Sequence, residues 1–324
     1  MAGYNTIRGL RVKYLSADPA NAENGQVWYN STTGNLRVEG IQGAGTWASG
    51  GALNTARANV AGFGTQTAAI AAAGDSYPAS PRNSANAEEY NGSSWANVAS
   101  LNTGRTGAIS SKLSPSSSGS LYGGEPSGAT HEYWNGSSWS EQTDMNTPGY
   151  GGGGAGTQTS SLAMGGVRSS SPYNKTESWD GSSWTNENVV PFSTYNTPGT
   201  GSQTAAIIFG GNNPAINTTS EYDGSGWTGG GNLNTTNAGM GGAGIQTATL
   251  AFGGGNPPSS YLTVTEEYNG TSWSTKSSMA TARRSLGGSG NTSAALGFGG
   301  FSGAKSAVTE EFTVPVETKN LSTS

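Results

Sequence analysis

A segment of about 45 residues recurs along this chain, and it limits the possible folds more than any other feature. Its most constant part is a hairpin such as EEYNGSSW at 88–95, in which Asn-Gly or Asp-Gly precedes a tryptophan. Five of these tryptophans are spaced 44, 45, 43 and 46 residues apart, and a sixth precedes them by 48 residues. We expect each tryptophan to anchor one repeated unit: Trp47, Trp95, Trp139, Trp184, Trp227 and Trp273.

Each repeat predicts four short strands. The first is a glycine-rich stretch, and the second is an apolar run that ends in a glycine pair, as in AAIIFGG at 205–211. The third carries Glu and Tyr, and the fourth begins near the Trp. The Asn-Gly and Asp-Gly pairs favour a type I′ turn, in which both central residues have positive φ. Four short strands in this period are typical of a β-propeller blade.

The glycine pair, an aromatic residue about 20 positions later and a Trp five residues beyond it together resemble the kelch repeat. The resemblance covers roughly residues 53–316 and implies an all-β, six-bladed kelch-like β-propeller. The first unit departs from the pattern, with Ala73-Gly74 in place of the glycine pair. A solenoid built from the same repeats is the structural alternative.

The two ends of the repeat array complement one another. The last unit has three predicted strands, the third at 307–312, and then continues without a hairpin or a Trp. Trp47 lies in a predicted fourth strand that has no first three. We therefore expect residues near 45–50 to complete the last blade, which would close the ring and remove its open edges. The expected organisation is an N-terminal attachment arm and hairpin at 1–40, the six-bladed propeller at 41–316 and a C-terminal tail at 317–324.

The sequence favours a protein that is not an enzyme and has no metal or cofactor. It contains 0 Cys, which excludes thiolate metal sites and the Tyr–Cys cross-link of galactose-oxidase-like kelch enzymes. The single histidine, His131, has no nucleophile or ligand motif beside it. The hairpin at 178–184 differs from the sialidase Asp-box, because Gly181 follows Asp180 directly.

Glutamates recur in the third strand of the units, and paired carboxylates can carry out glycoside hydrolysis. However, neighbouring residues of a strand point to opposite faces, so an adjacent pair such as Glu88 and Glu89 would not act together. We assign the same repeat position to the single Glu132, Glu177 and Glu221. A residue that recurs in every blade is expected to be architectural, bonded to neighbouring backbone.

Charge and composition limit the partners. The net charge is −5 without a basic run, so nucleic acid is not an expected partner. No apolar stretch is long enough for membrane insertion. Gly accounts for 53 of the 324 residues, which suits short strands joined by many tight turns.

The segment LRVKYLSADPANAENGQVWYNSTTG at 10–34 resembles N-terminal segments of bacteriophage tail and other virion proteins. The resemblance implies a phage virion structural protein, made in the host cytoplasm and present in multiple copies per particle. Other virion proteins would bind the N-terminal arm. Our leading hypothesis is a tail fibre or receptor-binding component for host attachment. A head decoration or collar protein that stabilises the particle is the first alternative, and a propeller-type carbohydrate-active enzyme is the second.

One face of the disc is the predicted ligand-binding face. Loops that join the second to the third strand vary among units, and they should lie on the same side as the segments that join consecutive blades. Tyr and Arg are enriched at binding hot spots, and we expect this face to bind a host-surface glycan or a neighbouring virion protein. The candidate residues are Tyr77, Tyr173, Tyr261, Arg57, Arg105 and Arg283.

Overall fold

The computed structural model describes residues 12–19, 26–41, 43, 45–76, 78, 83–169, 171–212, 215–256 and 260–320. These residues form a propeller-like, all-β fold with seven four-stranded sheets and no helix. In this described part, no helix is available that could cross a membrane. The chain divides into two compact units, one comprising Thr46–Thr313 and the other Met1–Gly45 with Val314–Ser324.

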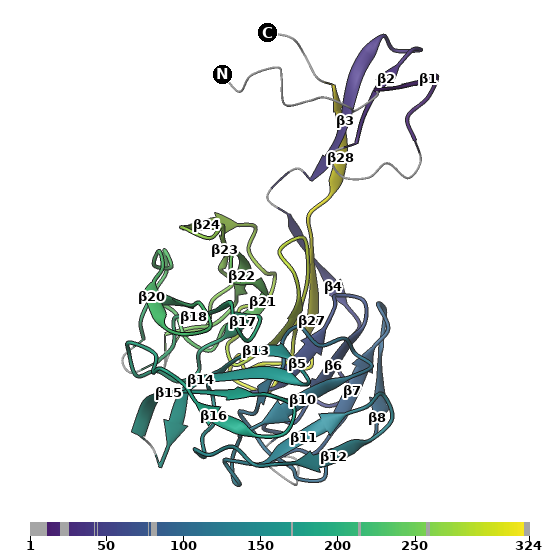
Figure 1. Ribbon diagram of the computed structural model, residues 1–324. Helices are drawn as coiled ribbons and strands as arrows, with labels where there is room; N and C mark the ends of the chain where they lie inside the picture. The colour runs from purple at the N-terminus through teal and green to yellow at the C-terminus, as the bar shows by residue number, and fades with distance from the viewer. Residues whose placement is uncertain are drawn as a thin grey trace. The chain divides into compact units, whose positions relative to one another are not determined.

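Six sheets make up the larger unit, and within each of them the neighbouring strands are antiparallel (Figure 1). We number these sheets in chain order. The first contains β5 (Ala61–Gly64), β6 (Ala69–Ala72), β7 (Ala87–Tyr90) and β8 (Trp95–Val98), and the second contains β9 (Ile109–Ser110), β10 (Gly119–Tyr122), β11 (His131–Trp134) and β12 (Trp139–Gln142). The third contains β13 (Gly153–Thr157), β14 (Ser160–Arg168), β15 (Ser171–Trp179) and β16 (Trp184–Asn186). The fourth contains β17 (Gly199–Gly201), β18 (Ala206–Phe209), β19 (Thr219–Tyr222) and β20 (Trp227–Gly229), and the fifth contains β21 (Gly241–Ile245), β22 (Ala248–Phe252), β23 (Thr265–Tyr268) and β24 (Trp273–Lys276).

The sixth sheet combines strands from the two ends of the larger unit. It contains β25 (Gly287–Gly290), β26 (Ala294–Phe298) and β27 (Thr309–Thr313), and its fourth strand is β4 (Thr46–Gly50). Trp47 of β4 lies opposite Phe312 of β27 in the antiparallel register. The strand expected near residues 45–50 therefore occupies the place that the missing last hairpin leaves.

The smaller unit is one sheet of β1 (Lys13–Leu15), β2 (Val27–Asn30), β3 (Asn35–Ile41) and β28 (Val316–Asn320). Trp28 is fully buried, and its indole N–H donates to Asp18 at 2.9 Å. The expected hairpin corresponds to β2 and β3. The expected C-terminal tail at 317–324 is wrong for its first residues, because β28 pairs with β3 in antiparallel fashion.

The hairpins before the tryptophans differ from the predicted two-residue type I′ turn. In the first sheet Tyr90 pairs with Trp95, so four residues form the loop. The side chain of Asn91 accepts hydrogen bonds from the backbone N–H groups of Ser93 and Ser94, both at 3.0 Å, and only Gly92 has a positive φ. The Asn or Asp is therefore needed as a hydrogen-bond acceptor and not for left-handed backbone.

The tryptophans join each sheet to the one before it in space. The indole of Trp95 donates to Thr309 Oγ1 of the sixth sheet at 2.9 Å, and that of Trp47 donates to Thr265 Oγ1 of the fifth at 2.9 Å. Trp95, Trp139, Trp184 and Trp273 are each 6% exposed, whereas Trp47 and Trp227 are half-buried. The first four are therefore buried.

A glutamine in the turn between the first two strands makes a second connection. Gln66 of the first sheet donates to the carbonyl of Phe312 at 2.6 Å and to that of Ala295 at 3.2 Å, both in the sixth sheet. Gln158, Gln203 and Gln246 bond the preceding sheet in the same way. The recurring Gln-Thr sequence therefore clamps adjacent sheets together.

The innermost strands are rich in glycine because neighbouring sheets approach there closely. A Cβ atom on Gly154 of β13 would lie 2.2 Å from the carbonyl oxygen of Ser110 of β9. A Cβ atom on Gly288 of β25 would lie 2.9 Å from the backbone nitrogen of Gly242 of β21. Larger residues would separate the sheets, so the high glycine content is needed for this packing.

Candidate binding site at the channel mouth

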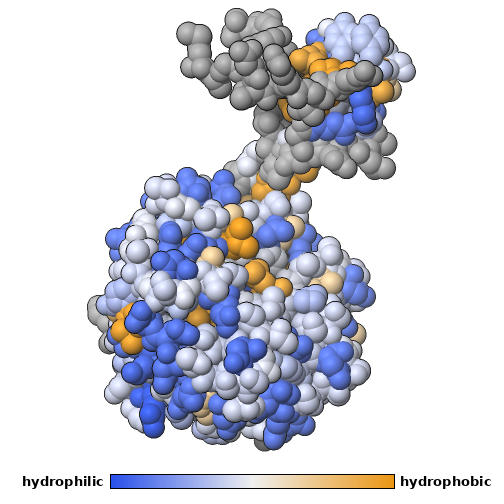
Figure 2. Space-filling model, in the orientation of Figure 1, coloured by the Kyte–Doolittle hydropathy of each residue, from blue (hydrophilic) through white to orange (hydrophobic). Residues whose placement is uncertain are grey.

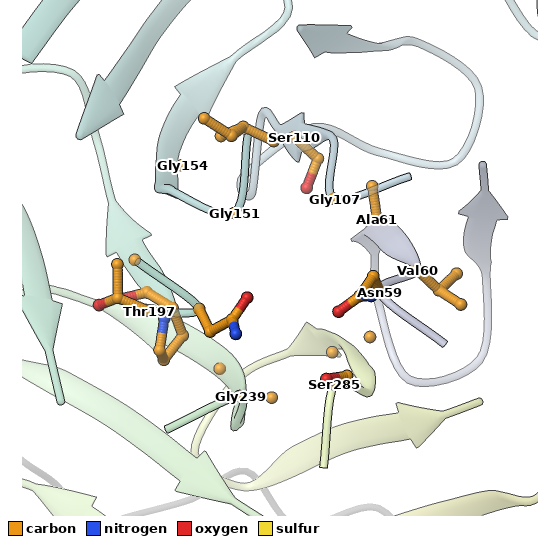
Figure 3. A pocket seen from close by; sticks show the side chains of 18 of the residues that line it. Asn59, Val60, Ala61, Gly107, Ser110, Gly151, Gly154, Thr197, Gly239 and Ser285 are labelled. Atoms are coloured by element: carbon orange, nitrogen blue, oxygen red, sulfur yellow. The ribbon is translucent and has the colours of Figure 1, made fainter. Parts of the chain in front are cut away.

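A central channel of about 90 Å³ lies between the innermost strands, and its lining includes residues of all six sheets (Figure 3). At one end of the channel, six equivalent residues before the innermost strands surround the opening, and all have positive φ. We call this ring the channel mouth. Its members are Asn59, Gly107, Gly151, Asn196, Gly239 and Ser285.

Backbone hydrogen bonds run around the channel mouth from one sheet to the next. Gly107 donates to Asn59 at 3.2 Å, Asn59 to Ser285 at 2.8 Å, and Ser285 to Gly239 at 2.6 Å. The ring continues from Gly239 to Asn196, from Thr197 to Gly151 and from Gly151 to Gly107. This ring fixes the backbone of the mouth, so that side chains placed around it are held on a rigid support.

The side chain of Lys112 contributes to the lining of the channel. Its ammonium group donates to the carbonyls of Gly62 at 3.2 Å and Gly288 at 3.1 Å, which belong to the first and sixth sheets. Within the described part of the chain it has no ion pair. Burial of the ammonium end lowers its pKa to about 8, although part of the side chain remains accessible.

A second ring of side chains borders the mouth, and it differs from sheet to sheet. Each member immediately precedes a mouth residue and forms an isolated β-bridge with the start of the following variable loop. The variable loops and the segments between sheets are thus brought together, as the sequence predicts. The six bridged pairs are Ala58 with Asp75, Thr106 with Glu125, Tyr150 with Val167, Tyr195 with Asn212, Ala238 with Gly255 and Arg284 with Phe301.

One hollow at this end has a volume of about 280 Å³. Tyr150, Tyr195 and Asn212 line it together with Arg284 and the mouth residues beside them. A second cavity of about 180 Å³ has Arg284, Phe301 and Lys305 in its wall. Asn59, Arg284 and Ser285 line both cavities, so the two are adjacent. Aromatic rings, amides and one guanidinium group around a hollow are suited to binding a polar ligand.

The three arginines predicted to be binding residues are structural, and that assignment is wrong. Arg57, Arg105 and Arg283 are fully buried. Arg57 forms an ion pair with Glu88 at 2.8 Å and donates to the carbonyls of Ala73 and Asn86. Arg105 pairs with Glu132, and Arg283 with Glu310. Burial lowers the pKa of each arginine, and the paired carboxylate opposes this effect.

The buried glutamates are architectural, as the sequence suggests. Glu132 accepts hydrogen bonds from the backbone N–H groups of Asn102 at 2.8 Å and Thr103 at 3.4 Å, and it also pairs with Arg105. Glu221 was assigned to this position incorrectly. Ser220 occupies it in the fourth sheet, while Glu221 points to the other face and accepts a hydrogen bond from Tyr268 of the fifth sheet.

The three predicted tyrosines have different outcomes. Tyr77 lies outside the described residues. Tyr173 is half-buried, and its hydroxyl lies 1.7 Å from the place where a Cβ atom on Gly149 would be. Gly149 is the repeat counterpart of Arg105, so Tyr173 fills the arginine's space in the third sheet; its assignment to the binding face is wrong. Tyr261 remains at the mouth, where its ring lies 5.9 Å from that of Phe301.

His131 lies in an aromatic cage and not in a catalytic arrangement. It is fully buried, and its ring centroid lies 4.7 Å from that of Trp179 and 5.2 Å from that of Trp184. Its Nε2 atom has no hydrogen-bond partner among the described residues. Burial lowers its pKa to about 3, because the charged form would lose its hydration.

Replacing His131 with Thr, the residue at this position in four of the other sheets, should improve acid tolerance. The folded-state pKa lies below the ordinary value of 6.5, so the stabilising contribution is complete above pH 6.5 and is lost as the pH falls towards 3. Between pH 7 and 4 the wild type should lose roughly 2–3 kcal/mol more unfolding free energy than the variant does. Urea unfolding at both pH values measures this difference. Equal losses in the two proteins would contradict the assigned pKa.

The sequence does contain a signal for the mouth residues that the prediction missed. In the three segments between sheets that contain a buried Arg, they are the two positions after it, as in Arg57-Ala58-Asn59 and Arg283-Arg284-Ser285. The prediction chose the Arg itself, but its side chain is buried in an ion pair with the glutamate of its own sheet. The next residue borders the mouth.

Comparison with known proteins gives no assignment for this site. No protein-family model matches the chain, and no curated protein matches its sequence.

Proposed function

We propose that the larger unit is a closed six-bladed propeller of kelch type. Its support is the hydrogen-bond ring at the mouth together with three contacts between the first and last sheets. These are the bond from Trp95 to Thr309, the bonds from Gln66 to Ala295 and Phe312, and an apolar cluster that includes Trp95 and Phe298. Pairing of β4 with β27 would then join the ends of the ring.

The function that this arrangement supports best is ligand binding without catalysis, with the channel mouth as the binding face. One observation carries the proposal. The backbone of the mouth is repeated in every sheet, whereas the bordering positions hold Ala, Thr, Tyr, Tyr, Ala and Arg in turn. Different side chains presented on a repeated backbone are typical of a recognition surface.

We further propose that the protein is a bacteriophage virion component, such as a tail fibre or receptor-binding protein. This proposal rests on the resemblance of the N-terminal segment to those of phage virion proteins. The smaller unit would bind other virion proteins, and the channel mouth would bind a host-surface glycan. In Figure 2 the visible surface of the larger unit is mainly hydrophilic or intermediate, with small scattered hydrophobic areas, which suits a polar ligand.

Substitution of Tyr150 and Tyr195, the two tyrosines that border the mouth, tests the binding face. Tyr150→Ala/Tyr195→Ala introduces the residue that the first and fifth sheets have at these positions, Ala58 and Ala238, so the fold should be kept. Loss of two aromatic contacts should weaken attachment of the labelled full-length protein to host cells by at least about tenfold. Flow cytometry measures this attachment.

A matched control changes one tyrosine of the smaller unit. Tyr14→Ala removes a tyrosine that is 75% exposed in the smaller unit and should leave attachment unchanged. Equal attachment by wild type and the double variant, with unchanged melting temperatures, would overturn the binding face. If attachment instead falls for Tyr14→Ala and not for the double variant, the contact with host cells lies in the smaller unit.

A further inference from the structure

Arg284 has an environment unlike that of any other arginine described above. Its guanidinium carbon lies 5.6 Å from the centroid of Tyr261 and 5.9 Å from that of Phe301. Lys305 also approaches Phe301, with its ammonium nitrogen 5.3 Å from the ring centroid. Two aromatic rings thus support one guanidinium group at the junction of the two mouth cavities.

Among the residues that the structure describes, the Arg284 guanidinium has no carboxylate partner. Within the described residues no ion pair or side-chain hydrogen bond involves it, and its Nη1 atom is shielded from solvent without a hydrogen-bond partner. Lys305, by contrast, pairs with Asp75 at 2.6 Å. A shielded donor without an acceptor is rare in folded proteins, and a missing ligand is one physical reason for it.

We propose that Arg284 binds the carboxylate of an acidic saccharide; this rests on the proposed binding function of the mouth. A guanidinium group presents paired N–H donors that match the two oxygens of a carboxylate. The aromatic support holds the group in position without neutralising its charge. Arg57, Arg105 and Arg283 are not available for this role, because they are buried in ion pairs.

The rest of the cavity favours a saccharide over an acidic peptide. Tyr150 and Tyr195 provide aromatic surface, and Asn59, Asn196 and Asn212 provide amides that can both donate to and accept from hydroxyl groups. Glu125, which forms a β-bridge with Thr106 at this end, also raises the pKa of Tyr150, although burial is the larger cause. A carboxylate at this end would repel a polyacidic peptide more strongly than a ligand with a single acidic group.

Calorimetric titration of the full-length protein with matched saccharides tests this inference. The probes are sialyllactose against lactose, glucuronate against glucose, and a tetraglutamate peptide. The wild type should bind at least one acidic saccharide about tenfold or more tightly than its neutral counterpart. Arg284→Ala should remove this preference, and the fold should be kept because Ala58 and Ala238 are its counterparts.

Two control variants separate charge from geometry. Lys276 lies in the outermost strand of the fifth sheet and is paired with Glu267. Lys276→Gln removes this cation, and the variant should keep the preference for acidic saccharides. Arg284→Lys keeps the charge but loses the paired donors, and it should retain only part of the preference.

The failure of this inference can be told from failure of the binding function. Equal binding of acidic and neutral saccharides, weakened by Tyr150→Ala/Tyr195→Ala, would refute the role of Arg284 and leave the binding face standing. Tighter binding of tetraglutamate than of any saccharide, or no binding of any probe by a wild type that still attaches to host cells, would refute the acidic saccharide as ligand.

Discussion

Deletion of residues 1–50 should lower the melting temperature of the larger unit by at least about 10 °C or cause it to aggregate. The deletion removes β4, which leaves β27 as an exposed edge. It also removes Trp47, whose ring lies 5.0 Å from that of Phe252 and 5.3 Å from that of Phe312. Loss of one large packed side chain alone costs roughly 3–5 kcal/mol, and about 1 kcal/mol shifts the melting temperature of a unit of this size by 2–4 °C.

Deletion of residues 1–45 is the matched control. It removes β1, β2 and β3 as the longer deletion does, but it keeps β4. Calorimetry and gel filtration of the two truncated proteins isolate the effect of this strand. The same melting temperature and a monomeric state in both would show that β4 does not stabilise the ring.

Arg105→Met should destabilise the protein by roughly 3–5 kcal/mol, because it leaves the Glu132 carboxylate buried without its cation. The arginine also donates to the carbonyl of Thr130, which would lose its partner. Chemical unfolding measures the loss.

Arg105→Asn is the control for that substitution. The fifth sheet has Asn237 at the equivalent position, where its amide donates to the carbonyl of Gly253 at 2.8 Å, and Glu266 remains buried in that sheet. The asparagine variant should therefore lose less stability than the methionine variant. Equal losses would show that the volume of the side chain matters and its hydrogen bonds do not.

The repeat made the sheets predictable, because the spacing of Trp, the glycine pair and the hairpin is a local pattern. It also indicated the strand at residues 45–50, because the last unit lacks a fourth strand and Trp47 lies in a fourth strand without the first three. Side-chain directions were harder to predict. Arg57 and Ala58 are adjacent, yet one is buried with Glu88 and the other borders the mouth.

The assignment of Glu221 failed for a related reason. Alignment by residue type placed it with Glu132, but the strand register places Ser220 there. In a strand, a shift of one residue exchanges the two faces. The mouth itself depends on a turn in which Asn59, Asn196 and Ser285 have positive φ, and these residue types alone do not reveal that conformation.

Hydrogen–deuterium exchange of the full-length protein, with and without surface glycan purified from host cells, tests the central claim most directly. The claim is that the variable ring around the channel mouth is the binding face. Bound glycan should slow exchange at residues 149–151, 195–197 and 284–286 and leave the hairpins at 91–94 and 180–183 unchanged. Protection of those hairpins, with no change around the mouth, would contradict the claim.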